Sequence, residues 1–236
     1  METRALEGGG KIRIARTEID IPHRGEIVTF VTPLVGPNNY PKVMGEIDSQ
    51  GLLRPTTAQT FSLLNIALQN EDEPGFADLL RIFRDDYLWT STRSTAFPGG
   101  VLVYDDIDGT MPSDSVGLLK LIEVGDKRVR LVKLGFKTRY MPISDLLKNP
   151  YLVAQVGGED MLPIVEKVAK AVDKKETYIH GVDHSEVKDK RYTALDGYGG
   201  GLGVDGDYRD GDGDGRAFGV LKTGEASRAE SEREKR

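Results

Sequence analysis

The chain has 236 residues, of which 38% are hydrophobic and 30% charged, a composition typical of a soluble globular protein of one or two domains. It contains no cysteine, which excludes disulfides, cysteine zinc sites and a cysteine nucleophile. The formal net charge of −6 argues against a nucleic-acid partner, because such a partner needs a concentrated basic patch. No apolar run is long enough for a signal peptide or a membrane span, so a cytoplasmic or virion-associated location is expected.

The first third of the chain shows strand-like and then helical patterns. Residues 1–10 end in three glycines and are expected to be a flexible leader. Thr56 and Gln59 have the spacing of a capping box and predict a helix start. In chain order, the expected elements are a hairpin of residues 11–15 and 26–31 around a turn at 22–25, a loop at 33–41, and helices at 41–50, 56–69 and 74–86.

The middle of the chain mixes short strands with scattered helices. The expected strands cover residues 87–92, 100–104, 128–134 and 177–180, and the expected helices cover 115–124, 142–148 and 158–172. Strand–helix–strand units do not alternate, which favours an α+β fold. Residues 11–221 are expected to form a single domain, followed by a charged, flexible tail at 222–236.

Residues 196–215 follow a different compositional rule from the rest of the chain. They contain nine glycines, six aspartates and two tyrosines, and they carry a net charge of −5. Apolar and polar residues alternate over 202–207, which predicts a strand with one packed face and one exposed face. Tyr, Asp and Gly at exposed positions are typical of antibody-like binding surfaces. The residues assigned to the packed scaffold are Leu202, Val204, Gly206, Ala217 and Phe218.

The acidic residues also allow a calcium hypothesis. Asp210, Asp212 and Asp214 alternate with glycines, as at the start of a calcium-binding loop. Position 12 of that loop is Leu221 instead of a bidentate glutamate, which excludes a complete EF-hand. The alternative function is therefore a calcium-stabilised adhesion or structural module that uses the loop at 210–215. A solvated loop without any ligand also stays open, and no catalytic constellation is found, so an enzyme is not expected.

Two motifs and the unusual segment resemble a known family. LWTST at 88–92, GRAFGV at 215–220 and the stretch 195–215 look like the variable proteins of diversity-generating retroelements, in particular archaeal and viral members. In that family, adenine-directed mutagenesis changes AAC codons, and one or two adenine changes give Asp, Gly or Tyr. The last motif is also similar to formylglycine-generating enzymes, but this chain lacks the cysteine for their chemistry.

The resemblance implies an α+β C-type lectin-like domain with a mixed or antiparallel sheet, flanking helices and a buried Trp89. It implies a hypervariable surface at about 195–215 that binds a protein or another macromolecule and needs no cofactor. The residues expected to bind the ligand are Tyr198, Gly199, Gly200, Gly201, Gly203, Asp205, Asp207, Tyr208, Asp210, Gly211, Asp212, Gly213 and Asp214.

Overall fold

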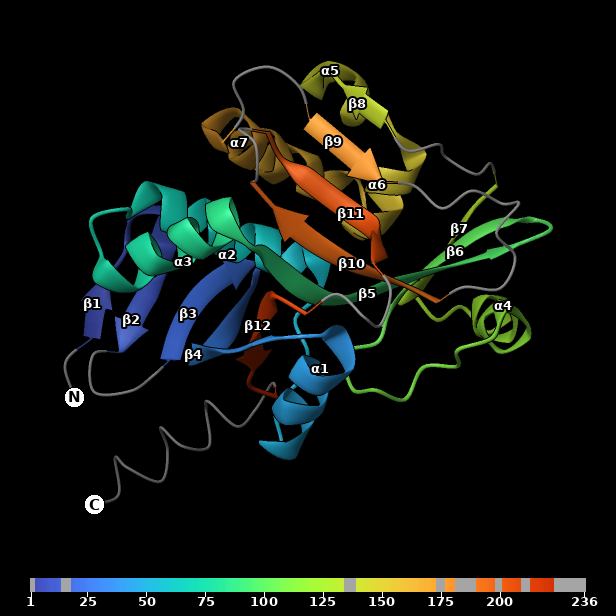
Figure 1. Ribbon diagram of the computed structural model, residues 1–236, viewed down its shortest axis with the longest axis horizontal. Coiled ribbons are helices and arrows are strands. Elements are labelled where there is room, and N and C mark those ends of the chain that lie inside the picture. The colour runs from blue at the N-terminus through green and yellow to red at the C-terminus, as the bar shows by residue number, and fades with distance from the viewer. Residues whose placement is uncertain are drawn as a thin grey trace.

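Helices lie on both sides of a long mixed sheet in the computed structural model, which describes residues 3–13, 18–133, 139–172, 177–180, 190–197, 201–208 and 213–222 (Figure 1). The strands are β1 (Thr3–Ala5), β2 (Lys11–Arg13), β3 (Glu18–His23), β4 (Glu26–Asn38), β5 (Tyr87–Phe97), β6 (Gly100–Asp105), β7 (Val129–Val132), β8 (Arg139–Met141), β9 (Thr177–His180), β10 (Lys190–Asp196), β11 (Gly203–Tyr208) and β12 (Gly215–Val220). The helices are α1 (Tyr40–Ser49), α2 (Thr57–Gln69), α3 (Pro74–Asp85), α4 (Ser115–Glu123), α5 (Ile143–Leu146), α6 (Pro150–Gln155) and α7 (Leu162–Val172). Within the ranges described, no helix is long and apolar enough to cross a bilayer.

The last strand in the sequence lies near the middle of the sheet. The strand order is β1-β2-β3-β4-β12-β5-β10-β11-β9-β8, with β6 beside β5 and β7 beside β6. β12 is antiparallel to β4 and parallel to β5, and β11 is parallel to β9. β12 therefore joins the N-terminal strands to the C-terminal ones, and the unusual segment leads directly into this joint.

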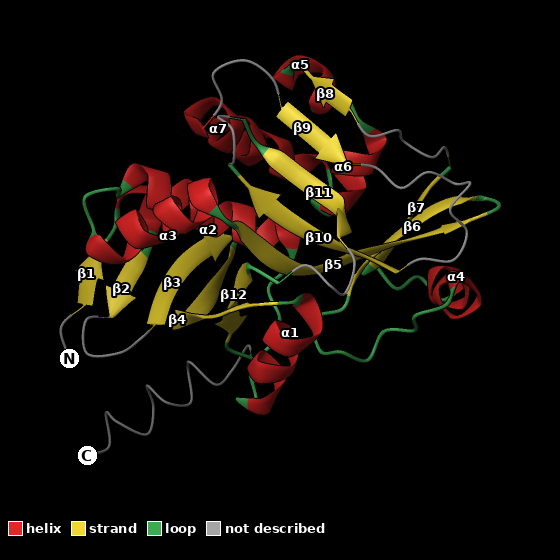
Figure 2. Ribbon diagram, in the orientation of Figure 1, coloured by secondary structure: helices red, strands yellow, loops and turns green. Residues whose placement is uncertain are grey.

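Three groups of buried apolar side chains hold the elements together. The largest contains Leu88 of β5 together with side chains of α2, α3, α6 and α7. The second lies under α1 and contains Trp89, the neighbour of Leu88 on the same strand. Because successive residues of a strand point to opposite faces, α1 covers the face opposite the main core (Figure 2). The third group lies under α4.

Helices with a local start signal are confirmed. Thr56 Oγ1 accepts a hydrogen bond from the Gln59 N–H at 3.1 Å, and Gln59 Oε1 accepts one from the Thr56 N–H at 2.9 Å. Pro41 and Pro74 lie in the first turns of α1 and α3, where a missing N–H costs nothing. These signals act within four residues, so the sequence alone reveals them.

The N-terminal strands differ from the prediction. Arg24 and Gly25 make the hairpin turn, with φ of 51° and 82°, so Pro22 stays within β3 and pairs with Ile27. The strand that forms the hairpin with β4 is therefore β3, and not the segment at 11–15. Within the expected leader, β1 pairs with β2 and Leu6 is buried, which corrects that expectation because this part of the chain packs on the domain.

The expected loop at 33–41 is also wrong, because β4 continues to Asn38. Pro33 and Pro37 lie outside the paired positions of the β4–β12 ladder, where its register shifts, so their missing N–H groups leave no ladder bond unmade.

In the C-terminal half, β8, β10 and α6 were not predicted, and the expected helix at 158–172 is divided into a 3₁₀ turn, Glu159–Met161, and α7. The expected helix at 142–148 is the single turn α5. Apart from Lys222, the expected tail at 222–236 lies outside the described residues.

The β3–β4 hairpin places a histidine whose protonation opposes folding. His23 Nδ1 lies 2.8 Å from Ser62 Oγ of α2. Burial, with the positive charge of Arg24 next to it, lowers the pKa of His23 from 6.5 to about 4, while Asp160 partly opposes this. As the pH falls, the unfolded chain therefore binds a proton at His23 at a higher pH than the folded chain does.

We expect the folded protein to lose about 1–2 kcal/mol of stability through His23 as the pH falls from 6.5 to 4, a value discounted because the ring is partly exposed. Urea unfolding at pH 7, 5.5 and 4.5 measures this loss. In His23→Gln, the pH dependence should be weaker by that amount. The same slope in both proteins would contradict the assignment.

Candidate functional site

The strand predicted at 202–207 has one packed face, as its alternation indicates. β11 is antiparallel to β10, with Val204 opposite Leu195. Leu195, Leu202 and Val204 are fully buried in the main core, which confirms the scaffold assignment of the last two. Asp205 is half-buried on the opposite, outer face of the strand. The outer face of β11 is therefore the one that can present side chains to a ligand.

The strand register places the candidate residues of β11 beside residues of β10 and β5. Asp205 lies opposite Ala194 of β10, which in turn lies opposite Trp89 of β5. Cross-strand neighbours share a face, so these positions form rows across β11, β10 and β5. The three rows are Gly203–Asp196–Tyr87, Asp205–Ala194–Trp89 and Tyr208–Tyr192–Arg93.

Aromatic rings support this outer face. Trp89 is fully buried, as the resemblance implied, and its Nε1–H donates to the Asn38 carbonyl at 3.0 Å. Tyr40 of α1 stacks on Tyr192 at 3.9 Å between ring centroids and meets Trp89 edge-on at 5.6 Å. Tyr87 meets Trp89 edge-on at 4.8 Å. These rings give the outer face of β5 and β10 a rigid base.

A buried cation lies at the end of this aromatic cluster. The Arg93 guanidinium is 4.8 Å from the Tyr192 ring centroid and 5.7 Å from that of Tyr40. Its Nη1 donates to Asp106 at 2.8 Å, and Arg54 donates to the same carboxylate at 3.0 Å. Burial raises the pKa of the Tyr40 hydroxyl far above its usual value, so this ring stays neutral beside the cation.

The predicted site residues fall into three groups. The first group has described side chains or backbone and a known exposure: Gly201 and Asp205 are half-buried, Gly203 is buried, and Gly213 and Asp214 are exposed. For Asp207 and Tyr208 the structure describes the backbone, which belongs to β11. Tyr198, Gly199, Gly200, Asp210, Gly211 and Asp212 lie outside the described residues.

The glycines of the segment are not equivalent. A Cβ on Gly203 would overlap the Asp196 carboxylate, whereas a Cβ on Gly213 would meet no atom within 4 Å. A Cβ on Gly215 would overlap the Trp89 indole and the Tyr87 ring. Gly215 therefore belongs to the scaffold, although the expected variable stretch at 195–215 includes it; the same holds for Leu195.

Sequence reasoning did not single out Tyr87 or Asp196 as parts of this face. Tyr87 becomes a neighbour of the segment, and Asp196 is placed between Tyr87 and Gly203, only through the pairing of β10 with β5 and β11, and β10 was not predicted. The one local signal was the LWTST motif, which marks β5 but does not show what pairs with it.

No group of three or more His, Asp or Glu side chains that could hold a metal ion is found among the residues that the structure describes. Asp210 and Asp212 of the calcium hypothesis lie outside those residues. The calcium hypothesis therefore needs an experiment.

Comparison with solved structures identifies the fold. The chain is similar to a structure described as the accommodation of massive sequence variation in Nanoarchaeota by the C-type lectin fold, with a TM-score of 0.52 over 78% of this chain and 94% of that one. This protein has an α+β C-type lectin fold. The two chains are 16% identical, so the likeness shows the fold alone. No family model and no curated protein matches the sequence.

Within the C-type lectin fold of this chain, β5, β10 and β11 form the sheet whose outer face carries the candidate residues (Figure 2). The arrangement offers the partly exposed Tyr87 ring, the half-buried Asp205 carboxylate and main-chain groups, next to a rigid cluster of buried aromatic rings. Such a surface suits binding by contact, in which tyrosine supplies area and the small residues adapt.

Proposed function

We propose that this chain is a ligand-binding protein that displays a hypervariable surface generated by retroelement-directed mutagenesis. The observation that carries the proposal is the division between two faces at β11: Val204 and Leu202, the residue directly before the strand, lie in the core, and Asp205 lies on the outer face. Variation confined to the outer face leaves the core packing unchanged. The role is binding and not catalysis, and the ligand is a protein or another macromolecule.

Composition and fold both support this proposal. Seventeen of the twenty residues at 196–215 are Gly, Asp or Tyr, three of the residues that adenine changes in AAC codons can produce. The similar solved structure is described as accommodating massive sequence variation in the same fold. An aromatic base under a segment of small and acidic residues suits recognition of varied macromolecular surfaces.

The DNA around the gene tests the proposal. We expect a near-copy of the 3′ end that carries AAC where this gene has GAC, GGC or TAC, next to a reverse transcriptase gene. Sequencing many copies of the gene from one population should show variation at codons for outer-face residues such as Asp205, and none at Leu202 or Val204. Absence of the near-copy, or equal variation at core codons, would overturn the proposal.

A matched pair of glycine substitutions tests where the displayed segment ends and the packed scaffold begins along the chain. Gly213→Ala should change the free energy of unfolding by less than about 0.5 kcal/mol, because the new methyl group meets no atom. Gly215→Ala should cost about 1–3 kcal/mol, because its methyl group overlaps two packed rings. Urea unfolding of both variants measures the difference. Similar costs would contradict this boundary.

The effect of calcium on thermal stability distinguishes the proposed binding function from the alternative, a calcium-stabilised adhesion module. We expect millimolar calcium to leave the melting temperature unchanged, because Leu221 stands where the closing carboxylate would be needed. A calcium site would instead add about 2.7 kcal/mol at 100 times its dissociation constant. A rise of several degrees that chelator reverses, and that Asp210→Asn with Asp212→Asn abolishes, would favour the adhesion module.

A further inference from the structure

The chain enters the segment 198–214 at a fixed point. The Gly197 N–H, directly after β10, donates to the Phe83 carbonyl in the last turn of α3 at 2.6 Å. Gly197 is buried, and a Cβ there would lie 3.3 Å from the Phe83 ring and 3.4 Å from its carbonyl oxygen. Phe83 is itself fully buried in the main core. A Cβ at 197 would therefore be a tight contact, and the chain or the Phe83 ring would have to shift by a few tenths of an ångström to accept it.

The chain leaves the segment at a second fixed point close to the first. The Asp214 N–H donates to the Tyr87 hydroxyl at 3.1 Å. The next residue, Gly215, lies against the rings of Tyr87 and Trp89 with no room for a Cβ. Because Trp89 is fully buried, the Tyr87 ring that packs against it has a defined position.

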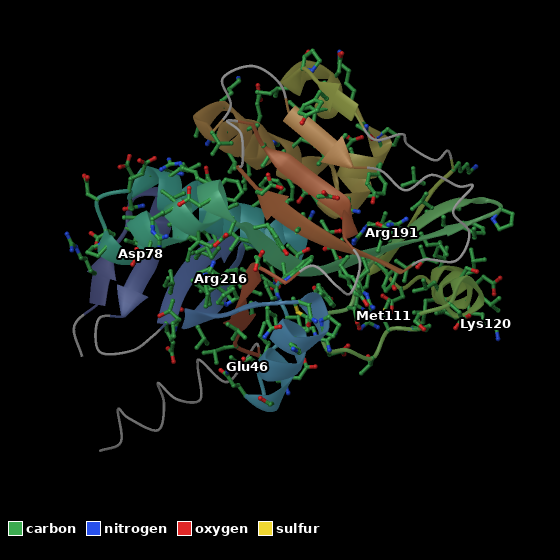
Figure 3. The ribbon with its side chains drawn as sticks, viewed as in Figure 1. Glu46, Asp78, Met111, Lys120, Arg191 and Arg216 are labelled. Atoms are coloured by element: carbon green, nitrogen blue, oxygen red, sulfur yellow. The ribbon has the colours of Figure 1, made fainter. Side chains whose placement is uncertain are left out.

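A third contact lies one residue into β12. Arg216, labelled in Figure 3, pairs with the Asp86 carboxylate through its Nη1. Phe83, Asp86 and Tyr87 belong to one short stretch, residues 83–87, where α3 ends and β5 begins. This α3–β5 corner therefore contacts the chain on both sides of the segment.

The hydrogen bonds at the two ends of the segment do not depend on the segment's side chains. Both hydrogen bonds use main-chain N–H groups of the segment's ends, so they form whichever side chains the segment carries. The two glycines keep side chains out where the corner comes close. Residues between these points that lie outside the core can change while the ends of β10 and β12 keep their positions.

We propose that the α3–β5 corner holds both ends of the segment 198–214, and that Tyr87 is the positioning residue of the C-terminal end. The inference deepens the proposed function, on which it rests for the statement that this segment is the displayed one. It assigns to the corner two main-chain contacts that form whatever side chains the segment carries. It also narrows the stretch that can be displayed from 195–215 to 198–214, without the core residues Leu202 and Val204.

Amide hydrogen exchange followed by NMR tests the proposal without any ligand. Tyr87→Phe keeps the ring and removes only the hydroxyl, so the amide of residue 214 should exchange about tenfold faster. The amide of Gly197 should keep its rate, since its acceptor is unchanged. Asp214→Ala is the matched variant: after correction for intrinsic exchange rates, its amide should remain as protected as in the original protein.

Three results would overturn the proposal. They are an unchanged amide 214 in Tyr87→Phe, an equal loss of protection in Asp214→Ala, and an equal acceleration at Gly197 and residue 214 in Tyr87→Phe. The last would mean that the hydroxyl supports the whole domain and not this end of the segment. Codon variation is measured separately, so failure of the corner and failure of the proposed function give different results.

Discussion

Replacing Asp106 by alanine is expected to lower the free energy of unfolding by about 3–5 kcal/mol, since it leaves the largely buried Arg93 guanidinium without its carboxylate partner, whereas Arg54 keeps its ion pair with Asp48. The Asp106 side chain is 2% exposed and accepts hydrogen bonds from Arg54 and Arg93. Its other oxygen accepts the Met111 N–H at 3.1 Å. Arg93 is held among tyrosine rings, and its side chain is only 11% exposed, so water cannot replace the lost carboxylate.

Asp108→Ala is the matched control for this prediction. Asp108 lies two residues further along the same loop, is exposed, and accepts hydrogen bonds from Thr110. Its loss should cost less than about 1 kcal/mol. Urea unfolding measures both variants, and near-ultraviolet circular dichroism reports the packing of the tyrosines around Arg93. Equal costs for the two variants would show that the buried ion pairs do not organise this end of the outer face.

Replacing Phe218 by alanine is expected to cost about 3–5 kcal/mol through lost burial and the cavity left behind. Phe218 is 3% exposed in β12 and meets Phe30 of β4 edge-on, with 5.8 Å between ring centroids. It lies in the main core at the joint between the N-terminal and C-terminal strands. The loss should appear as a lower urea midpoint with an unchanged slope.

Substitutions on the outer face provide the comparison. Asp205→Asn keeps the size of the side chain and should change the free energy of unfolding by less than about 1 kcal/mol, because the side chain is half-buried and outside the core. Display on a scaffold requires this contrast between Phe218 and Asp205. Comparable damage at both positions would contradict a division of the C-terminal strands into a packed face and a displayed one.

Some of the candidate site could be predicted because its signals are local. The alternation over 202–207 separates a packed face from an outer face, and Val204 and Asp205 follow it in the structure. The excess of glycine and aspartate marks the segment without any knowledge of its partners. Both patterns involve residues that are close together in the sequence, so they can be recognised without knowledge of tertiary contacts.

The remaining parts of the site depend on contacts between distant residues. Tyr87 reaches Asp214 across 127 positions, and neither residue shows this in its neighbours along the chain. Likewise, Gly213 and Gly215 are the same residue in the same tract, and only the rings beneath Gly215 distinguish them.

The sequence by itself determined the helix starts, the packed face of β11 and the boundaries of the unusual composition, because capping, alternation and residue type act over a few residues. Tertiary structure alone decided that β3 is the partner of β4, that β10 lies between β5 and β11, and that the α3–β5 corner meets both ends of the segment. Strand pairing brings together residues far apart in the chain, and many pairings bury similar apolar area. The choice among them is made by the packing of the whole core, which no local pattern records.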